Sequence, residues 1–320
     1  MTVTDMKRSA AVAGPETGQR MRVFVTGASG WIGAAVVPEL IVAGHHVVGL
    51  ARSDDAAVAL AAAGVEVRRG SLDDLESLRA GARDSDGVIH LAFNHDFSDR
   101  AGAGRTERAA VETLGNALAG SDHPFLFASG VAMAPGRMLT ERDASPMSGP
   151  DSPRGGGEQL AFEYVERGVR SVSLRFAPTV HGDGDHGFIS TLVGIAREKG
   201  ISGYVGDGSN RWPAVHRLDA ARLVALALDK APAGSVLHAV AEEGVAAREI
   251  AEVIGRHLDV PVVSVTPADA AGHFGWIGAI FALDVPASST LTQELLGWAP
   301  THPGLIEDLE AGHYFRTASA

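Results

Sequence analysis

The stretch Thr26-Gly27-Ala28-Ser29-Gly30-Trp31-Ile32-Gly33 decides the fold of this chain. It follows a short β-branched run at 22–26 and precedes residues 31–43, which the pattern predicts to be a helix. Glycines at this spacing between a strand and a helix predict a turn that binds phosphates at the helix N-terminus. Gly27 permits the tight turn, Gly30 lets the main chain approach a pyrophosphate, and Gly33 lets the helix pack on the sheet. The dinucleotide contacts predicted here are Gly27, Ser29, Gly30, Trp31, Ile32 and Gly33.

Outward from this turn, short apolar strands and helices alternate. We expect strands at 22–26, 46–50, 65–68, 87–92, 124–128 and 169–176. We expect helices at 31–43, 53–63, 72–80, 101–119 and 158–166. Such alternation requires crossover connections and a parallel sheet that is covered on both faces. The predicted fold class is therefore α/β, a Rossmann-type doubly wound parallel sheet.

After Pro178 the alternation loosens, and glycine-rich loops occur at 181–187 and 203–208. We expect further helices at 218–229 and 246–258, and strands at 236–240 and 262–266. The predicted organisation is a disordered leader (1–20), a cofactor-binding domain (21–180, also taking in about 210–240) and a smaller interleaved lobe (mainly 181–320).

Composition limits the function classes. The formal net charge is -12, which argues against nucleic acid and anionic membranes as partners. Cysteine is absent, which excludes disulfides, thiolate nucleophiles and zinc–thiolate sites. No apolar run reaches the ~18 residues of a membrane span, and residues 1–20 carry no apolar signal-peptide segment. We expect a cytoplasmic protein whose partner is a small-molecule substrate.

The residues after the second strand indicate which dinucleotide is bound. The strand at 46–50 ends in Ala51-Arg52-Ser53, with no acid before Asp54. NAD sites carry an acid here for the ribose 2′-hydroxyl, whereas NADP sites carry an arginine. Arg52 can pair with a 2′-phosphate and Ser53 can add a hydroxyl. This favours NADP(H) over NAD(H); a solvated surface arginine is the alternative.

Six motifs follow one another along the chain: TGASGWIG, ARS, GSLDD at 70–74, GVIHLAF at 87–93, LRFAPTVHGDGD at 174–185 and VHRLDAARL at 215–223. From about residue 22 to 219 they resemble the extended short-chain dehydrogenase/reductase family of NAD-dependent epimerases and dehydratases. The resemblance implies a parallel sheet of about seven strands with a C-terminal substrate lobe. It also implies a homodimer through the helices at 101–119 and 158–166.

The same resemblance implies further cofactor contacts. Ser71 and Leu72 would lie near the adenine, and Ala177 and Pro178 beside the nicotinamide. Three more residues would line the cofactor cleft: Leu91, Ala92 and Phe93.

The family's catalytic tyrosine and lysine, spaced Y-x-x-x-K, are absent. The tyrosines are Tyr164, Tyr204 and Tyr314, and none precedes a lysine by four positions. Aligning Ser152-Pro153 with the family's S-P-Y puts Arg154 at the tyrosine position and Glu158 at the lysine position. Counting back from Arg175 puts Pro150 and Arg154 there instead. The family's catalytic serine is matched best by Ser129, although Gly130 aligns equally well.

Other groups could take over proton transfer. His95 and Asp96 directly follow the fourth strand, where residues face the ligand crevice. His181, a further candidate for proton transfer, and His186 lie in the loop after the sixth strand. We expect substrate contact there rather than a metal site, and a plain loop is the alternative. Arg154 could bind the nicotinamide ribose or an anionic substrate, but a guanidinium is no general acid at neutral pH.

Candidate substrate contacts are Tyr204, Arg211 and Trp212, with core packing equally open for Trp212. Three functions follow. The first is an NADP(H)-dependent oxidoreductase acting on a small carbonyl or alcohol with a non-standard proton donor. The second is a non-catalytic NADP-binding sensor, and the third is an isomerase or lyase that uses pocket His and Asp. The resemblance places the oxidoreductase first.

Overall fold

The computed structural model describes residues 19–94, 99–131, 134, 136–152 and 154–316. A seven-stranded sheet runs in the order β10-β6-β5-β4-β1-β2-β3, and each of its neighbouring pairs is parallel. Its strands are β1 (Arg22–Thr26), β2 (His46–Ala51), β3 (Glu66–Arg69), β4 (Gly87–His90), β5 (Pro124–Gly130), β6 (Arg170–Phe176) and β10 (Val236–Ala239). The predicted α/β Rossmann class is confirmed.

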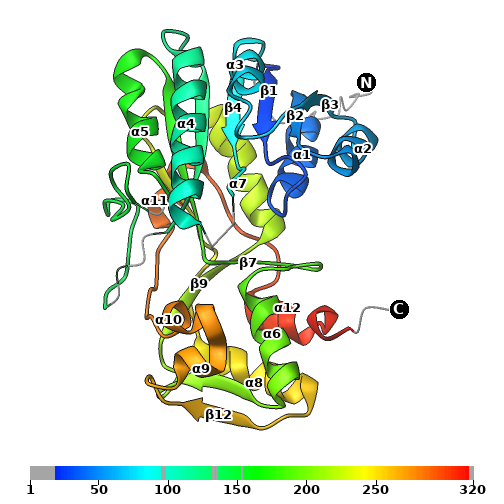
Figure 1. Ribbon diagram of the computed structural model, residues 1–320, viewed down its shortest axis with the longest axis vertical. Helices are drawn as coiled ribbons and strands as arrows, with labels where there is room; N and C mark the ends of the chain where they lie inside the picture. The colour runs from blue at the N-terminus through cyan, green and yellow to red at the C-terminus, as the bar shows by residue number, and fades with distance from the viewer. Residues whose placement is uncertain (1–18, 95–98, 132–133, 135, 153, 317–320) are drawn as a thin grey trace, which may run out of the picture.

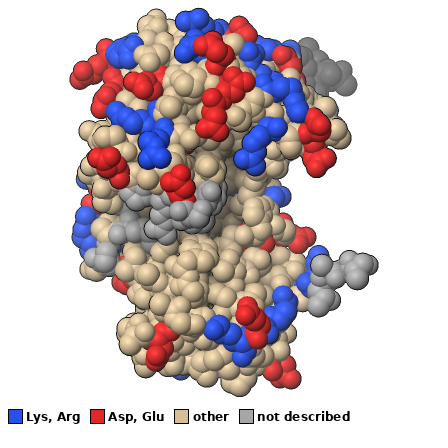
Figure 2. All heavy atoms as spheres, in the orientation of Figure 1, with Lys and Arg blue, Asp and Glu red and all other residues tan. Residues whose placement is uncertain are grey.

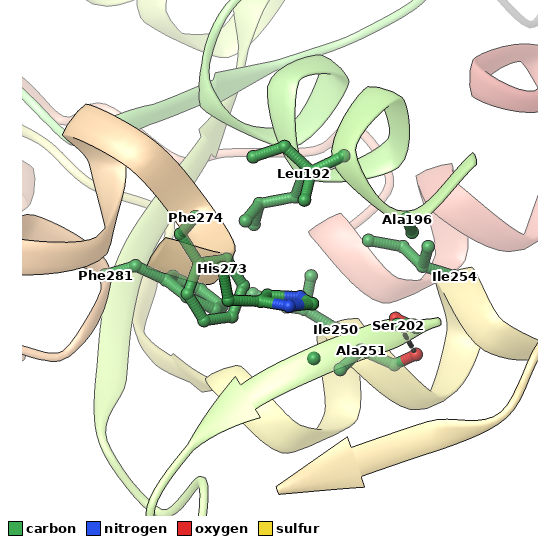
Figure 3. A pocket seen from close by; sticks show the side chains of 11 residues that line it. Leu192, Ala196, Ser202, Ile250, Ala251, Ile254, His273, Phe274 and Phe281 are labelled. Atoms are coloured by element: carbon green, nitrogen blue, oxygen red, sulfur yellow. Dashed lines mark hydrogen bonds between the residues drawn. The ribbon is translucent and has the colours of Figure 1, made fainter. Parts of the chain in front are cut away.

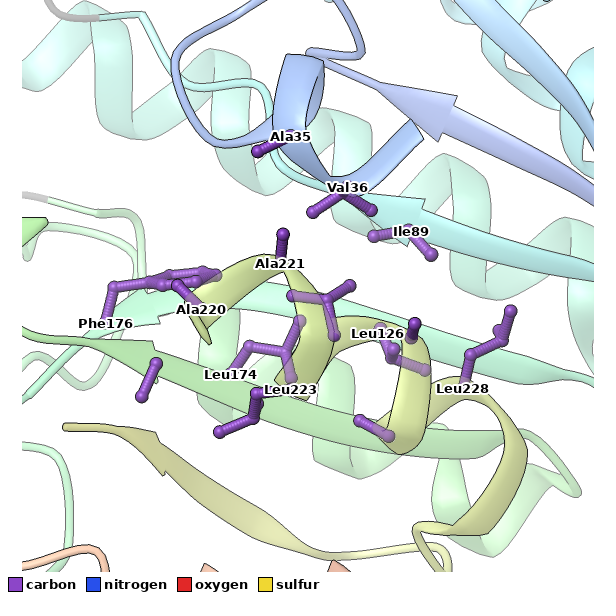
Figure 4. Close-up of a cluster of buried hydrophobic side chains, with 14 of the residues drawn as sticks. Ala35, Val36, Ile89, Leu126, Leu174, Phe176, Ala220, Ala221, Leu223 and Leu228 are labelled. Carbon is purple, nitrogen blue, oxygen red and sulfur yellow. The ribbon is translucent and has the colours of Figure 1, made fainter. Parts of the chain in front are cut away.

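Helices cover both faces of this sheet (Figure 1). One face carries α1 (Gly33–Val42), α2 (Asp54–Ala62), α7 (Arg217–Lys230) and α11 (Thr290–Leu296). The other carries α3 (Leu75–Arg83), α4 (Arg100–Leu118) and α5 (Gly157–Glu163). Alternation along β1 explains both cores, because Val23 and Val25 face the α7 side while Phe24 faces the α4 side. Figure 4 shows α7 placing Leu223 and Leu228 against the strands.

A smaller lobe lies at the carboxyl end of the sheet (Figure 1). A three-stranded sheet joins it to the Rossmann layer: β7 (Thr179–His181), β9 (Arg211–His216) and β11 (Glu242–Ala246). A two-stranded sheet pairs β8 (Ser202–Val205) with β12 (Val262–Val265). Its helices are α6 (Phe188–Lys199), α8 (Ala247–Leu258), α9 (Ala270–Phe274), α10 (Gly278–Phe281) and α12 (Leu305–Glu310). Trp212 and Phe281 lie in the core of this lobe.

Some element bounds differ from those expected. Helix α3 begins at Leu75, because the Asp74 side chain accepts a hydrogen bond from the Ser77 amide and caps it there. Helix α5 ends at Glu163 and gives way to a 3₁₀ turn, Val165–Arg167. Helix α6 was not expected at all, although Ile189, Leu192, Val193 and Ala196 repeat with helical spacing on its buried face. In the described residues no helix is long and apolar enough to cross a membrane.

Candidate functional site

The glycine turn between β1 and α1 is shaped by close contacts of the main chain. Gly27 has φ +71°, and a Cβ there would lie 2.7 Å from the Ala92 amide nitrogen. A Cβ on Gly33 would lie only 2.0 Å from the Gly27 carbonyl oxygen. The residue before α1 is Ile32, whose side chain has no polar atom to cap the helix. The Ala34 and Ala35 amides donate to the Gly30 and Ile32 carbonyls, so an anion such as a pyrophosphate would be attracted by the positive end of the helix dipole.

The end of β2 carries two arginines from neighbouring strands. Arg52 and Ser53 are exposed just past β2, and the Ser53 hydroxyl caps α2 by accepting a hydrogen bond from the Ala56 amide. Arg69 at the end of β3 pairs with Ala51 in register, donates to the Ser53 carbonyl at 2.6 Å and forms an ion pair with Asp54. Asp54 is thus engaged by Arg69 rather than by Arg52.

The other expected cofactor contacts follow the carboxyl ends of parallel strands. Ser71 and Leu72 come after β3, and Ala177 and Pro178 come after β6. The remaining three follow β4: Leu91, Ala92 and Phe93. The strand order reverses between β1 and β4, and a crevice at such a point is where open α/β sheets bind ligands. Figure 2 shows this face hollowed where the two lobes meet.

A chain of buried polar side chains runs beneath this crevice. His90 Nδ1 lies 2.7 Å from Thr26 Oγ1, and His90 Nε2 lies 3.3 Å from Glu107 Oε2. Arg154 Nη2 lies 3.1 Å from both Glu107 Oε1 and the Ala128 carbonyl oxygen. The Arg154 guanidinium stacks 4.1 Å from the centre of the Phe93 ring. Arg154 is therefore fixed next to Phe93 and the end of β5.

Ser129 and Glu158 belong to a second buried group. Arg175 donates to both Glu158 oxygens at 2.6 and 2.9 Å, and the Ser173 hydroxyl donates at 2.7 Å. Burial alone would raise the pKa of Glu158, but Arg175, Ser173 and Ser129 together lower it below its ordinary value. Glu158 is thus an anchored carboxylate. Of the residues that the two alignments place in the site, Arg154 is the one that both share.

The loop after β7 meets the glycine turn through Trp31. The Trp31 indole donates to the Val180 carbonyl at 2.8 Å, and the exposed His186 ring lies 5.6 Å from it. The Arg217 guanidinium lies 4.2 Å from the centre of the same indole. His181 is fully buried and pairs with Asp308 at 2.8 Å. The loop therefore presents His186, and not His181, to solvent.

A tyrosine of the 3₁₀ turn His313–Phe315 pairs with a carboxylate of the same loop. The Tyr314 hydroxyl donates to Asp185 at 3.0 Å and accepts from the Gly182 amide at 3.3 Å. Burial raises the pKa of Asp185 above its ordinary value. The sequence alone does not reveal this pairing, because Tyr314 lies 129 residues from Asp185.

The expected substrate contacts in the lobe are engaged within it. Tyr204 lies in β8 with the Arg248 guanidinium 5.2 Å from its ring centre, and Arg211 forms an ion pair with Asp284 at 3.0 Å. Trp212 is buried in the lobe core, where its ring meets Phe188 and Phe281; this is the core packing left open above. His95 and Asp96 lie outside the described residues.

A cavity inside the lobe is too small for a substrate (Figure 3). Its volume of about 10 Å³ suits at most one water molecule. Its lining is apolar except for Ser202 and His273. Burial lowers the pKa of His273, which favours the neutral ring. Among the described residues, no group of three His, Asp or Glu side chains converges as metal ligands would.

Comparisons with known proteins agree with this geometry. The model of the "NAD dependent epimerase/dehydratase family" matches residues 23–240. The chain is 47% identical over 297 residues to "Uncharacterized protein C2A9.02" of Schizosaccharomyces pombe, covering 92% of this chain and all of that one. It is 27% identical to the "4-hydroxy-2-methyl-3-oxo-4-farnesyl-3,4-dihydroquinoline-1-oxide ketoreductase" of Stigmatella aurantiaca, covering 80% of each.

Solved structures show the same fold. The dTDP-glucose 4,6-dehydratase DesIV from Streptomyces venezuelae, solved with NAD bound, superposes with a TM-score of 0.72. The match covers 92% of this chain and 96% of that one, at 21% identity.

Proposed function

The chain belongs to the NAD dependent epimerase/dehydratase family, and within it we propose an NADP(H)-dependent oxidoreductase that acts on a small carbonyl or alcohol. The observation that carries this proposal is the glycine turn, whose contacts at Gly27 and Gly33 admit no side chain, opening onto the crevice between β1 and β4. Such a crevice holds a dinucleotide at the carboxyl ends of the strands.

The arginines at the ends of β2 and β3 support NADP(H) over NAD(H). Arg52 is exposed beside the turn, and Arg69 adds a second guanidinium from the next strand. Asp54, the first acid after β2, is paired with Arg69. A 2′-phosphate would meet positive charge here, whereas the carboxylate that an NAD ribose prefers is engaged.

Arg154 supports a reactive centre near the end of β5. It is held between Phe93 and the Ala128 carbonyl oxygen, next to Ser129. When bound, NADPH would supply the hydride that reduces a carbonyl carbon. Arg154 would hold the nicotinamide ribose, and its high pKa keeps it from donating the proton that the substrate oxygen needs. That proton would come from His95, from Ser129 or from a water held with the substrate.

The relative that is a ketoreductase supports reduction of a carbonyl over pure sensing. So do the polar groups at the crevice, because a protein that only senses the cofactor has less need of a buried ion pair and a fixed arginine there. Family membership alone is compatible with epimerase or dehydratase chemistry, which makes isomerase or lyase activity the alternative outcome of the test below.

The test combines turnover with a cofactor-bound structure. We expect NADPH to be oxidised in the presence of small aldehydes or ketones, more slowly with NADH, and more slowly again in the Ser129→Ala variant. In a crystal structure with NADPH, polar side chains should lie within hydrogen-bond reach of the position that a substrate carbonyl oxygen takes beside the nicotinamide C4. If NADPH binds but no carbonyl is reduced, and only apolar groups surround C4, the oxidoreductase proposal fails.

A further inference from the structure

We propose that Glu107 and His90 are positioning residues that hold Arg154 against the nicotinamide ribose, in place of the family's missing lysine. This inference rests on the proposed function, because it assigns a ligand to the same crevice. Glu107 lies in none of the quoted motifs, and His90 lies in GVIHLAF without a role assigned to it. Glu107 lies in the middle of α4, and His90 is the last residue of β4.

Each hydrogen bond of this chain can be assigned one donor and one acceptor. Glu107 accepts from Arg154 at Oε1, and its Oε2 must accept from His90 Nε2. A neutral His90 that carries its proton on Nε2 then accepts at Nδ1 from the Thr26 hydroxyl. Thr26 Oγ1 in turn accepts from the Ala92 amide at 3.3 Å. The chain thus links the last residue of β1, at the glycine turn, to the Arg154 guanidinium.

Burial makes this chain more than a surface contact. His90 is 0% exposed and Glu107 1% exposed, so Glu107 is a carboxylate that only a cation and further donors can stabilise. Arg154 supplies that cation, and its own side chain remains 23% exposed. The carboxylate is therefore inside the protein, while part of the Arg154 side chain is exposed.

The backbone beside Arg154 is also fixed against α4. Gly155 and Gly156 both have positive φ, and a Cβ on Gly155 would lie 2.1 Å from the Gly104 carbonyl oxygen. Gly104 is on α4, one turn before Glu107. The glycines therefore bring Arg154 to its partner by an approach that other residues could not make.

One donor of Arg154 has no acceptor among the described residues. The Nε–H is buried and has no hydrogen-bond partner in the described part of the chain. Buried donors of this kind cost free energy unless an acceptor arrives. Arg154 lies between the residues that follow β4 and those that end β5, away from the Arg52 end of the crevice. The ligand oxygens that we expect at that place are the hydroxyls of the nicotinamide ribose.

A double-mutant cycle tests this inference. We would measure Kd for NADPH and for 2′-phospho-ADP, which lacks the nicotinamide riboside, in wild type, Glu107→Gln, Arg154→Met and the double variant. We expect each single change to weaken NADPH about tenfold and to leave 2′-phospho-ADP unaffected. The double variant should bind NADPH no more weakly than Arg154→Met alone, because Glu107 acts through Arg154.

Additive losses in the cycle, or equal weakening of both ligands, would overturn the inference, since Glu107 would then support the fold in general. The matched control is Glu112→Gln, an exposed carboxylate on the same helix, which should bind NADPH as wild type does. If Glu107→Gln does not fold, Arg154→Lys keeps the charge and loses the Nε–H donor and the Nη2 that contacts both Glu107 and the Ala128 carbonyl. Wild-type affinity for NADPH in that variant would also overturn it. A wild-type protein that binds no NADPH would instead contradict the proposed function.

Discussion

At the scale of single residues, the site depends on close backbone contacts in the glycine turn and on a chain of hydrogen bonds from Thr26 to Arg154. The roles of Gly27 and Gly33 could be predicted because they depend on local backbone geometry. Arg69 could not be predicted, since only the register of β2 with β3 brings it beside Arg52. The chain from Thr26 to Arg154 was hidden for the same reason, as it joins β1, β4, α4 and the loop before α5.

Gly33→Ala should damage the turn. The added methyl would meet the Gly27 carbonyl oxygen at 2.0 Å, which forces backbone to move rather than a side chain. We expect a loss of stability of about 1–3 kcal/mol in urea unfolding, together with loss of NADPH binding. Gly194→Ala is the control, because it lies in α6 with nothing within 4 Å of its Cβ position. That variant should be more stable by about 0.5–1 kcal/mol, and an equal response of both variants would contradict this account.

At the scale of elements, the order of the Rossmann strands and helices could be predicted from the apolar runs and from the glycines that end helices. The ends of elements depended on side chains that the runs do not show, such as the Asp74 cap of α3. Helix α5 is anchored to β6 by the buried Glu158–Arg175 pair. The sequence places Glu158 at the family's lysine position in one of the two alignments. Its ion pair with Arg175 could not be predicted, because the two residues meet only when α5 packs against β6.

Arg175→Met should destabilise the protein strongly. It leaves the Glu158 carboxylate buried without its cation, which typically costs about 3–5 kcal/mol. Replacing both residues, Glu158→Gln with Arg175→Met, should cost less than Arg175→Met alone. The exposed pair Arg79–Glu76 gives a matched comparison, and Arg79→Met should change stability by less than about 1 kcal/mol. Equal losses at both pairs, measured by urea unfolding, would contradict the anchoring role.

The histidine that caps helix α7 should make the free energy of unfolding depend on pH. Its N-cap is His216, whose Nδ1 accepts from the Leu218 amide at 3.2 Å. Burial, with a contribution from His181, lowers the pKa of His216 to about 4. The unfolded chain therefore binds the proton first, and the stability contributed by the neutral ring is present above about pH 6.5 and lost as pH falls towards 4.

The variant His216→Asn keeps a capping oxygen and removes the titration. Its Tm should fall less steeply than that of wild type between about pH 6.5 and the pKa of about 4 that burial gives His216. His123→Asn, in the loop before β5, is the control and should follow the wild-type curve. Parallel curves for wild type and His216→Asn would show that His216 does not carry the pH dependence.

At the scale of the whole molecule, hydrogen bonds join segments that are distant in the sequence. Trp31 of the glycine turn reaches Val180 near the lobe, and the Asp219 carboxylate of α7 accepts from the Thr301 and His302 amides. Such long-range contacts explain why the lobe was the least predictable part. Strands β7, β9 and β11 are short, and they pair although they are spread between residues 179 and 246. No local sequence pattern therefore predicts them.

The homodimer through α4 and α5 that the family resemblance implies stays a proposal. The outward side chains of α4 include Arg105, Glu112 and Asn116, so such an interface would be polar and sensitive to salt. We expect light scattering at low salt to give twice the chain mass of 33.1 kDa and Glu112→Arg to reduce it. A mass of one chain under all conditions would remove the proposal.

The most direct test of the central claim is a calorimetric titration of wild type and Arg52→Ala with NADPH and with NADH. The glycine turn predicts that wild type binds both, and the arginines after β2 and β3 predict tighter binding of NADPH by about tenfold or more. Arg52→Ala should lose most of that preference and keep its affinity for NADH. Equal affinity of wild type and Arg52→Ala for NADPH would contradict the role of Arg52, and no binding of either dinucleotide would contradict the account as a whole.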